Sequence, residues 1–166
     1  MRLLILATLM SIGTLLTAQS KPQVYVFMAE KCPVCIYMTN PLQQVLDAHE
    51  NNAEFYAVFP VRTSSLKTAR KFLKENALDA LTPMIDSDQS YSKSFDAKVT
   101  PEVVVMLDDE LKYKGRISDA YRAPGKMKHG KRSNDLLHVL NILKENPAAT
   151  FTNHKAIGCF ITYHAK

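Results

Sequence analysis

The stretch that decides the fold runs from residue 24 to residue 49 and reads VYVFMAEKCPVCIYMTNPLQQVLDAH. Its first five residues, Val24 to Met28, are mostly β-branched or aromatic, which predicts a short buried strand. From Pro33 to about His49 apolar residues recur at helical spacing, which predicts a helix. Pro41 should kink that helix, because its ring removes one backbone hydrogen bond. The C-P-V-C motif therefore lies where a strand ends and a helix begins.

The first cysteine of the motif, Cys32, is predicted at or near the N-cap of that helix. Unpaired backbone N–H groups and the positive end of the helix dipole favour a thiolate there, the form that attacks disulfides. Lys31 adds a positive charge, and Pro33 fits the first turn, where its missing N–H removes no hydrogen bond. Cys35 lies one turn on, so we expect a more buried thiol of higher pKa. We predict a redox-active pair in which Cys32 attacks a partner and Cys35 then releases it.

A C-x-x-C motif is also compatible with a metal site, a haem attachment site or a non-catalytic disulfide. A zinc site would need two more ligands, and the sequence contains no second C-x-x-C. A haem attachment motif needs His directly after the second cysteine, where Ile36 stands. A non-catalytic disulfide stays open. We favour the redox pair because the motif and its strand-to-helix context agree.

The rest of the chain predicts one α/β domain with a central mixed sheet flanked by helices. Further strands are expected at 54–59, 103–107 and 111–117, a short apolar piece at 84–85, and helices at about 65–76 and 133–145. The turn Asp108-Asp109 joins the last two strands into an antiparallel hairpin, and Ser133 is the expected cap of the last helix. The alternation of strands and helices in the first half requires parallel strands with crossover helices. We assign residues 20–146 to this domain and 147–166 to a C-terminal tail without clear periodicity.

The N-terminus has the pattern of a secretory signal peptide. Met1 and Arg2 precede an apolar run at residues 3–16 and a small-residue exit. We therefore predict a signal peptide at residues 1–19, cleaved after Ala18, and an extracytoplasmic domain. An uncleaved anchor is the alternative, and membrane contact is expected only in that case.

The charge of the chain is mildly basic, with 21 Lys and Arg against 16 Asp and Glu. Removing Arg2 with the signal peptide leaves 20 against 16, a net charge of +4. No aromatic residues are interleaved with the basic ones as single-stranded nucleic-acid binding would favour, so no nucleic-acid partner is expected. The segment 121–132 is rich in Lys and Arg and is predicted as a mobile loop, with docking of an acidic partner as the alternative.

Two segments carry a resemblance to a known family. The motif stretch 27–35, FMAEKCPVC, resembles the active-site stretch of the thioredoxin superfamily, and residues 99–102, VTPE, resemble its cis-proline loop. Together with residues 113–117 they are most similar to exported bacterial redoxin-type proteins of the AhpC/TSA and TlpA-like branches. The ending AIGC at 156–159 is similar to tails in that group. The resemblance covers roughly residues 22–145.

The resemblance implies a thioredoxin-like fold and a periplasmic or otherwise extracytoplasmic thiol–disulfide oxidoreductase without a cofactor. Its partners would be protein thiols and disulfides of the cell envelope, with a membrane electron donor among them, and reduction of partners is slightly favoured. Pro101 would be cis and packed against Cys32, in a loop whose backbone pairs with an extended partner segment. The implied catalytic residues are Cys32, Cys35 and Pro101. The implied substrate-binding residues are Lys31, Pro33, Val34, Thr100 and Glu102.

The sequence departs from the family pattern at three positions. Val26 stands where thioredoxins carry a buried acid that helps to move the proton of the second cysteine. Glu102 is the candidate replacement, with a solvated strand-end charge as the alternative. Lys31 replaces the usual Trp, which weakens the expectation of a broad substrate grip. Ala29 replaces the Thr of peroxiredoxins, so a peroxiredoxin-like thiol peroxidase is a weaker alternative.

The third cysteine, Cys159, is unpaired in this scheme. It lies midway between His154 and His164, and soft thiolate and imidazole ligands suit copper or zinc. A copper-binding chaperone of thioredoxin-like fold is therefore an alternative function, although related chaperones have three residues between their cysteines rather than two. We expect no metal site. Cys159 is then either a small buried hydrophobe or a third thiol in the redox cycle.

Overall fold

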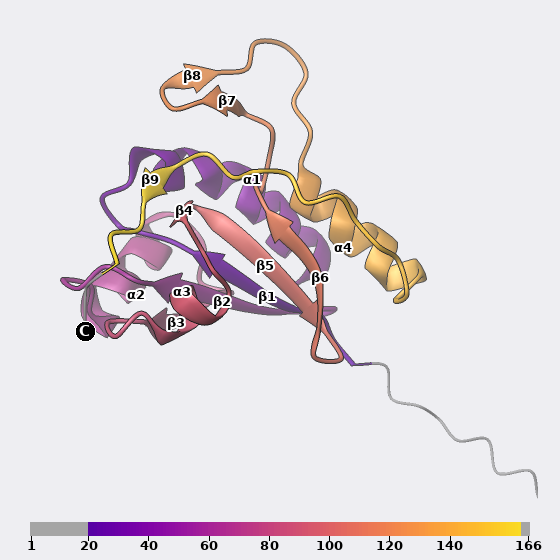
Figure 1. Cartoon of the computed structure of the whole chain (residues 1–166), viewed down its shortest axis with the longest axis horizontal. Helices are drawn as coiled ribbons and strands as arrows, with labels where there is room; N and C mark the ends of the chain where they lie inside the picture. The colour runs from indigo at the N-terminus through magenta and orange to yellow at the C-terminus, as the bar shows by residue number, and fades with distance from the viewer. Residues whose placement is uncertain (1–19, 164–166) are drawn as a thin grey trace, which may run out of the picture.

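The computed structural model describes residues 20–163, and the predicted signal peptide lies outside them (Figure 1). A five-stranded sheet in the order β3-β2-β1-β5-β6 forms its centre. The strands are β1 (Gln23–Phe27), β2 (Glu54–Phe59), β3 (Thr82–Ile85), β5 (Glu102–Leu107) and β6 (Glu110–Gly115). The first three run parallel, whereas β5 pairs antiparallel with both β1 and β6. The predicted mixed sheet with a C-terminal antiparallel hairpin is confirmed.

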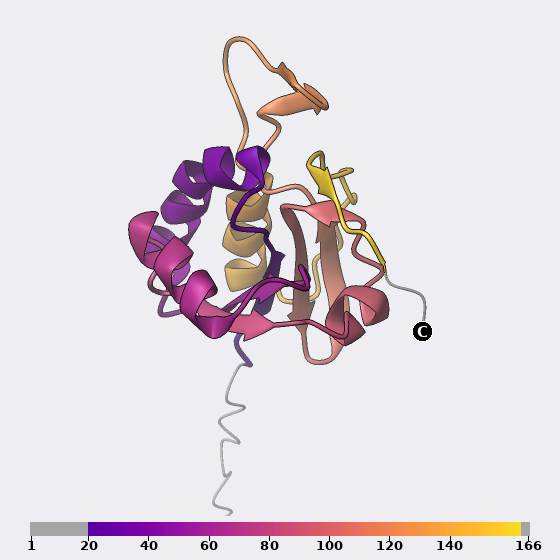
Figure 2. The ribbon, with the colours of Figure 1, turned by 90° about the vertical axis from the view of Figure 1, so that its left-hand side faces the viewer.

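Side chains of β1 alternate between two cores, as a strand buried on both faces requires. Val24 and Val26 enter the larger core, together with α1 (Pro33–His49), α2 (Leu66–Glu75) and α4 (Asp135–Glu145). Tyr25 and Phe27 face the smaller core, beside the short helix α3 (Ser90–Ser94) and Ile161 of the tail. Figure 2 shows the sheet edge-on, with the three longer helices on one side and α3 and the tail on the other.

Helix α1 begins as predicted, with Cys32 as its N-cap residue and Pro33 in its first turn. Its buried face follows the predicted apolar spacing and extends to His49, which is 3% exposed. Nε2 of His49 lies 2.9 Å from Oδ1 of Asn141 in α4, so the buried ring has a polar partner.

Helix α4 is capped by Asn134, not by Ser133 as expected. Oδ1 of Asn134 accepts a hydrogen bond from the N–H of Leu137 at 3.2 Å. The Ser133 hydroxyl instead donates to Asp135 at 2.6 Å. Both residue types cap helices well, so the sequence does not separate two adjacent candidates.

Short elements that were not predicted shape the remainder. They are α3, β4 (Val99–Thr100), β7 (Tyr121–Ala123), β8 (Lys126–Met127) and β9 (Cys159–Phe160). The basic segment 121–132 contains the β7–β8 hairpin, which projects beyond the body of the domain (Figures 1 and 2). Within the tail, β9 pairs antiparallel with β4. None of the helices between residues 20 and 163 is long and apolar enough to cross a membrane.

Candidate active site

The site is built around Cys32, at the point where the loop after β1 turns into α1. The Cys32 N–H donates to the Ala29 carbonyl at 3.1 Å, and its own carbonyl accepts the first helical hydrogen bond from Ile36. The residue has the extended backbone conformation of an N-cap (φ −81°, ψ 115°), and its side chain makes no capping hydrogen bond. Cys32 therefore stands at the end of the helix where the first-turn N–H groups have no helical acceptor, and this end favours a thiolate when the cysteine is reduced.

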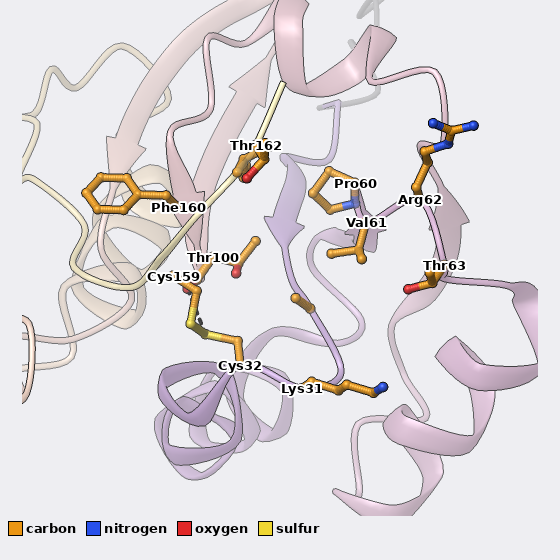
Figure 3. Close-up of a pocket in the computed structure, with 12 residues that line it drawn as sticks. Lys31, Cys32, Pro60, Val61, Arg62, Thr63, Thr100, Cys159, Phe160 and Thr162 are labelled. Carbon is orange, nitrogen blue, oxygen red and sulfur yellow. Dashed lines mark hydrogen bonds between the residues drawn. A yellow bond between two sulfur atoms is a disulfide. The ribbon is translucent and has the colours of Figure 1, made fainter. Parts of the chain in front are cut away.

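Cys32 forms a disulfide with Cys159, whose Cα lies 6.1 Å away and 127 residues along the chain (Figure 3). The sequence predicts Cys35 as the redox partner of Cys32, whereas the sulfur bonded to Cys32 in the structure is that of Cys159. Cys35 is a free buried thiol. Cys159 is partly buried and bonded to Cys32, so it is not the unbonded buried hydrophobe of one alternative, and a part for it in the redox cycle stays a prediction.

Cys35 has the properties expected of the second cysteine of the motif. It is 0% exposed and accepts a hydrogen bond from the Ala29 N–H at 3.5 Å. Burial raises the pKa of the Cys35 thiol to about 12, against the opposing effects of the Ala29 N–H and the Thr100 side chain; the negative charge of Glu30 adds to the rise. At neutral pH Cys35 is therefore a neutral thiol, held behind the disulfide.

The loop before β5 lies directly against the disulfide. The Thr100–Pro101 peptide bond is cis, as the family resemblance implied. The Thr100 carbonyl oxygen lies 3.2 Å from Sγ of Cys32, so a reduced Cys32 thiol would have an acceptor there. The predicted site residues Cys32 and Thr100, 68 residues apart, therefore meet, and Pro101 follows Thr100 through the cis bond.

The tail approaches this point as an extended strand. Cys159 is in register with Thr100, and Phe160 with Val99. The tail backbone lies so close to the loop that a Cβ on Gly158 would overlap the Thr100 carbonyl and lie 3.1 Å from the nitrogen of Pro101. The β9 strand thus fills the position beside Cys32 along the backbone of β4.

Hydrogen bonds hold the tail on both sides of Cys159. Before it, the His154 carbonyl accepts from the Arg116 N–H at 3.0 Å, and Nδ1 of His154 lies 2.9 Å from Asp135. After it, the Ile161 N–H donates to the Lys98 carbonyl at 3.0 Å, and further contacts reach α3. Those are Gln89 Nε2 to the Thr162 carbonyl at 2.8 Å and Tyr163 OH to the Ser92 carbonyl at 2.9 Å.

A pocket of about 320 Å³ adjoins the disulfide (Figure 3). Three segments and Thr100 line it: the motif residues Ala29, Lys31 and Cys32, the loop 60–63, and the tail residues 159–162. Two of the predicted binding residues, Lys31 and Thr100, belong to this lining, whereas Pro33 and Val34 lie outside it on the first turn of α1. Lys31 and Arg62 give the rim positive charge.

Glu102 is not the solvated charge that one alternative expected. It is 7% exposed, and its carboxylate accepts the Lys98 N–H at 2.7 Å. It alternates along β5 with Val103 and so shares the face of Val104, which packs in the smaller core, whereas Cys35 lies in the larger one. An acid whose charge acts on Cys35 is Glu30, which lies within the motif stretch and is not among the predicted site residues. The hydroxyls of Ser64 and Thr68 donate to Glu30 at 2.7 and 2.8 Å.

The metal alternative finds no support among residues 20–163, where no three His, Cys, Asp or Glu side chains gather into a group that could hold an ion. Cys159 is bonded to Cys32, and His154 is engaged with Asp135. His164 lies outside the described residues.

Comparison with known proteins shows the fold and little more. No family model matches the chain, and no curated protein matches it. A hypothetical protein from Sinorhizobium meliloti 1021 superposes with a TM-score of 0.75 at 18% identity, over 89% of this chain and 82% of that one. MTB DsbF, solved in mixed oxidized and reduced forms, gives 0.55 at 20% identity over 75% and 82%. A thioredoxin-like protein from Aeropyrum pernix gives 0.54 at 14% identity over 78% and 79%. The protein therefore has a thioredoxin-like fold.

Proposed function

We propose that the protein is an exported thiol–disulfide oxidoreductase that exchanges disulfides with partner proteins through Cys32 and Cys35. One observation carries the proposal: the sulfur at the N-cap of α1 is engaged in a disulfide with a strand laid along the cis-proline loop, while a free thiol lies one turn behind it. A buried structural disulfide needs no third cysteine at that place, whereas exchange chemistry does.

The reaction needs no cofactor. The Cys32 thiolate attacks one sulfur of a partner disulfide, a Cys32–partner bond forms, and the other partner sulfur leaves as a thiolate. Cys35 then loses its proton and attacks Sγ of Cys32, which frees the second partner sulfur and leaves a Cys32–Cys35 disulfide. Two electrons pass to the partner, and the reverse sequence oxidises a partner dithiol.

Three observations favour a redox protein that works outside the cytoplasm. The apolar N-terminal run is typical of a secretory signal peptide, and disulfides persist in oxidising compartments. The likeness to DsbF, whose structure holds mixed oxidized and reduced forms, favours redox chemistry on this fold. We therefore place the protein outside the cytoplasm, with envelope proteins as partners and a membrane electron donor that keeps Cys32 and Cys35 reduced, as in the TlpA-like branch.

Reduction of insulin by dithiothreitol tests the proposal. The mature wild-type chain should accelerate the precipitation of insulin, and Cys32→Ser should not. Because Cys32→Ser also removes the disulfide to the tail, Cys159→Ser is the matched control: it loses the same disulfide and keeps both motif cysteines. It should precipitate insulin at least as fast as the wild type. Activity in Cys32→Ser equal to that of Cys159→Ser would refute the assignment of the nucleophile.

A further inference from the structure

The nucleophile is covered in this structure. Cys32 is 3% exposed, and the segment bonded to it is the protein's own tail. A partner cysteine that bonds to Cys32 must take the place beside Sγ of Cys32 that Cys159 and its strand now hold. The following inference rests on the proposed function, because it asks how a partner gains access to the same sulfur.

We propose that the tail is an internal substrate: residues 158–162 occupy the partner-binding edge of β4, Cys159 is a third redox-active cysteine, and external partners are extended segments that carry a Gly-Cys pair. The tail and a partner compete for one surface. The oxidised protein rests as the closed Cys32–Cys159 form and opens when that bond is transferred to Cys35.

The pairing of β9 with β4 indicates where the backbone of a partner segment would lie. A two-residue strand gains little from its own hydrogen bonds, and β9 pairs with β4 where Cys159 faces Thr100, the residue that contacts Cys32. This register brings a cysteine on an antiparallel strand into bonding distance of Cys32. A partner segment laid on β4 in the same register would present its cysteine in the same way, since the pairing uses backbone groups that every sequence has.

The close approach of the tail backbone at Gly158 indicates which residue a partner carries before its cysteine. At the residue before the cysteine, a Cβ would overlap the Thr100 carbonyl and press on Pro101. Both neighbours are backbone atoms of a loop fixed between β4 and β5, so neither yields as a flexible side chain would. The binding edge therefore selects glycine at this position. The next position is permissive, because Phe160 is 82% exposed and points away from the disulfide in Figure 3.

The tether explains why the closed form prevails. Hydrogen bonds on both sides of Cys159, to Arg116 before it and to Lys98 after it, keep β9 at its docking site. A tethered segment meets its site at an effective concentration on the order of 1 mM, above that of a dilute partner. A partner must therefore bind better than the tail, or arrive after the disulfide has moved.

Transfer of the disulfide needs no external oxidant or reductant. Cys35 gives up its proton and attacks Sγ of Cys32, so that the Cys32–Cys35 bond forms and the Cys32–Cys159 bond breaks. Cys159 leaves as a thiolate and takes up a proton. One disulfide and one thiol are present before and after, so the step is an isomerisation. Its product leaves the tail free to lift away from β4.

Disulfide mapping of the oxidised mature chain tests the inference. Trypsin should place both motif cysteines in the peptide 32–62 and Cys159 in the peptide 156–166, so a cross-linked pair of these peptides reports the closed form. We expect the wild type to give mainly this pair, with free Cys35 alkylated. Gly158→Val should shift the population at least about fivefold toward the Cys32–Cys35 form, because the added side chain prevents docking.

Ala148→Val is the matched control, since it places the same β-branched side chain at an exposed position of the tail and should map like the wild type. Wild-type protein found only as Cys32–Cys35, or a Gly158→Val protein with an unchanged cross-link, would overturn the inference. The proposed function would survive that result if Cys32-dependent insulin reduction persists. Loss of insulin reduction together with an intact Cys32–Cys159 cross-link would instead identify a structural staple and refute the proposed function.

A peptide probe tests the partner class separately. The reduced Cys159→Ser chain is mixed with the peptide KAIGCFITY, whose cysteine carries a coloured aromatic thiol as a mixed disulfide, and the burst of released thiolate is followed. The peptide with Val in place of Gly is the matched probe. We expect the glycine peptide to react at least about tenfold faster. Equal rates would show that the edge of β4 does not select its partners in this way.

Discussion

Cys32 has two cysteines within its surroundings, and they lie in regions of opposite character. Cys35 belongs to α1, a regular helix that the sequence pattern predicts, and its place follows from a spacing of three residues. Cys159 belongs to a tail with one two-residue strand, and its place follows from hydrogen bonds to residues from across the chain. Local geometry therefore positions the near cysteine, and tertiary contacts position the distant one. Only the second arrangement can be released without unfolding a helix.

The largest expected effect concerns stability. Removing the bond to the tail with Cys159→Ser frees a loop of 127 residues in the unfolded chain, which the chain-entropy estimate puts at about 5 kcal/mol of unfolding free energy. Urea denaturation under oxidising conditions measures it. Cys35→Ala, which keeps the Cys32–Cys159 bond, is the control and should lose only about 1–2 kcal/mol. With dithiothreitol present, the gap between Cys159→Ser and wild type should close. A gap that persists under reduction would mean that the substitution acts through the packing of the Cys159 side chain and not through the disulfide.

The release step, in which Cys35 attacks the mixed disulfide on Cys32, should depend strongly on pH. Because the pKa of the Cys35 thiol is raised to about 12, its thiolate fraction grows about tenfold per pH unit below that value. Release by Cys35 should therefore accelerate roughly a thousandfold between about pH 6 and pH 9. An aromatic disulfide reacted with reduced Cys159→Ser should release two coloured thiolates, the first from attack by Cys32 and the second from Cys35.

The double variant Cys35→Ser/Cys159→Ser should lack the second phase, which assigns that phase to Cys35. A second phase that levels off near pH 8 would contradict the buried, neutral thiol. It would mean that the pKa of Cys35 falls once Cys32 has left the tail.

The contact between Asp135 and His154, which anchors the tail before Cys159, should have a smaller effect on the free energy of unfolding. Burial opposes ionisation of Asp135, but hydrogen bonds from Ser133, Arg116 and His154 outweigh it and hold the pKa of its carboxyl below the ordinary value of 3.8. Asp135→Asn should remove about 1–3 kcal/mol of unfolding free energy at neutral pH. A group with a lowered pKa stabilises the fold above its unfolded pKa and stops doing so as the pH falls through its folded one. The difference between wild type and variant should therefore shrink below about pH 4 in urea titrations.

The smallest effect is expected at Lys31. Its exposed ammonium lies at the rim of the pocket, where solvent and salt screen its action on the Cys32 thiolate. Lys31→Gln should slow the first phase of the aromatic disulfide reaction by about threefold or less, and added salt should remove even that difference. A loss of a hundredfold would show that Lys31 contacts the partner directly.

The sequence predicted what depends on local periodicity. The buried face of α1, the β5–β6 hairpin and the N-cap position of Cys32 all follow from the spacing of apolar residues and from turn residues. The same spacing would have placed His49 inside, because it lies seven residues after Leu42 and four after Val45. Nothing in a periodicity argument reaches β4 or β9, whose two residues each are too short to show a pattern.

The disulfide partner of Cys32 could not be read from the sequence, because the motif spacing indicates Cys35 and carries no information on a cysteine 127 residues away. A signal was nonetheless present. The tail places Gly158 directly before Cys159 and follows it with Phe160 and Ile161, which is the composition of a short strand that passes close to another backbone. The site residues of the helix were thus accessible to sequence reasoning, and the covering segment required the tertiary structure.

The smaller core lies between the sheet and a set of covering side chains. Ile161 of the tail is one of these covering side chains, and Phe27 and Val104 belong to the core beneath. Whenever the tail lifts, this apolar patch loses its lid and meets water. An incoming chain that offers an aliphatic residue two places after its cysteine would restore the lid. Binding of such a chain to the open protein replaces one covering side chain with another, so the buried apolar area changes little. Backbone pairing with β4 and the disulfide to Cys32 then decide which chains bind.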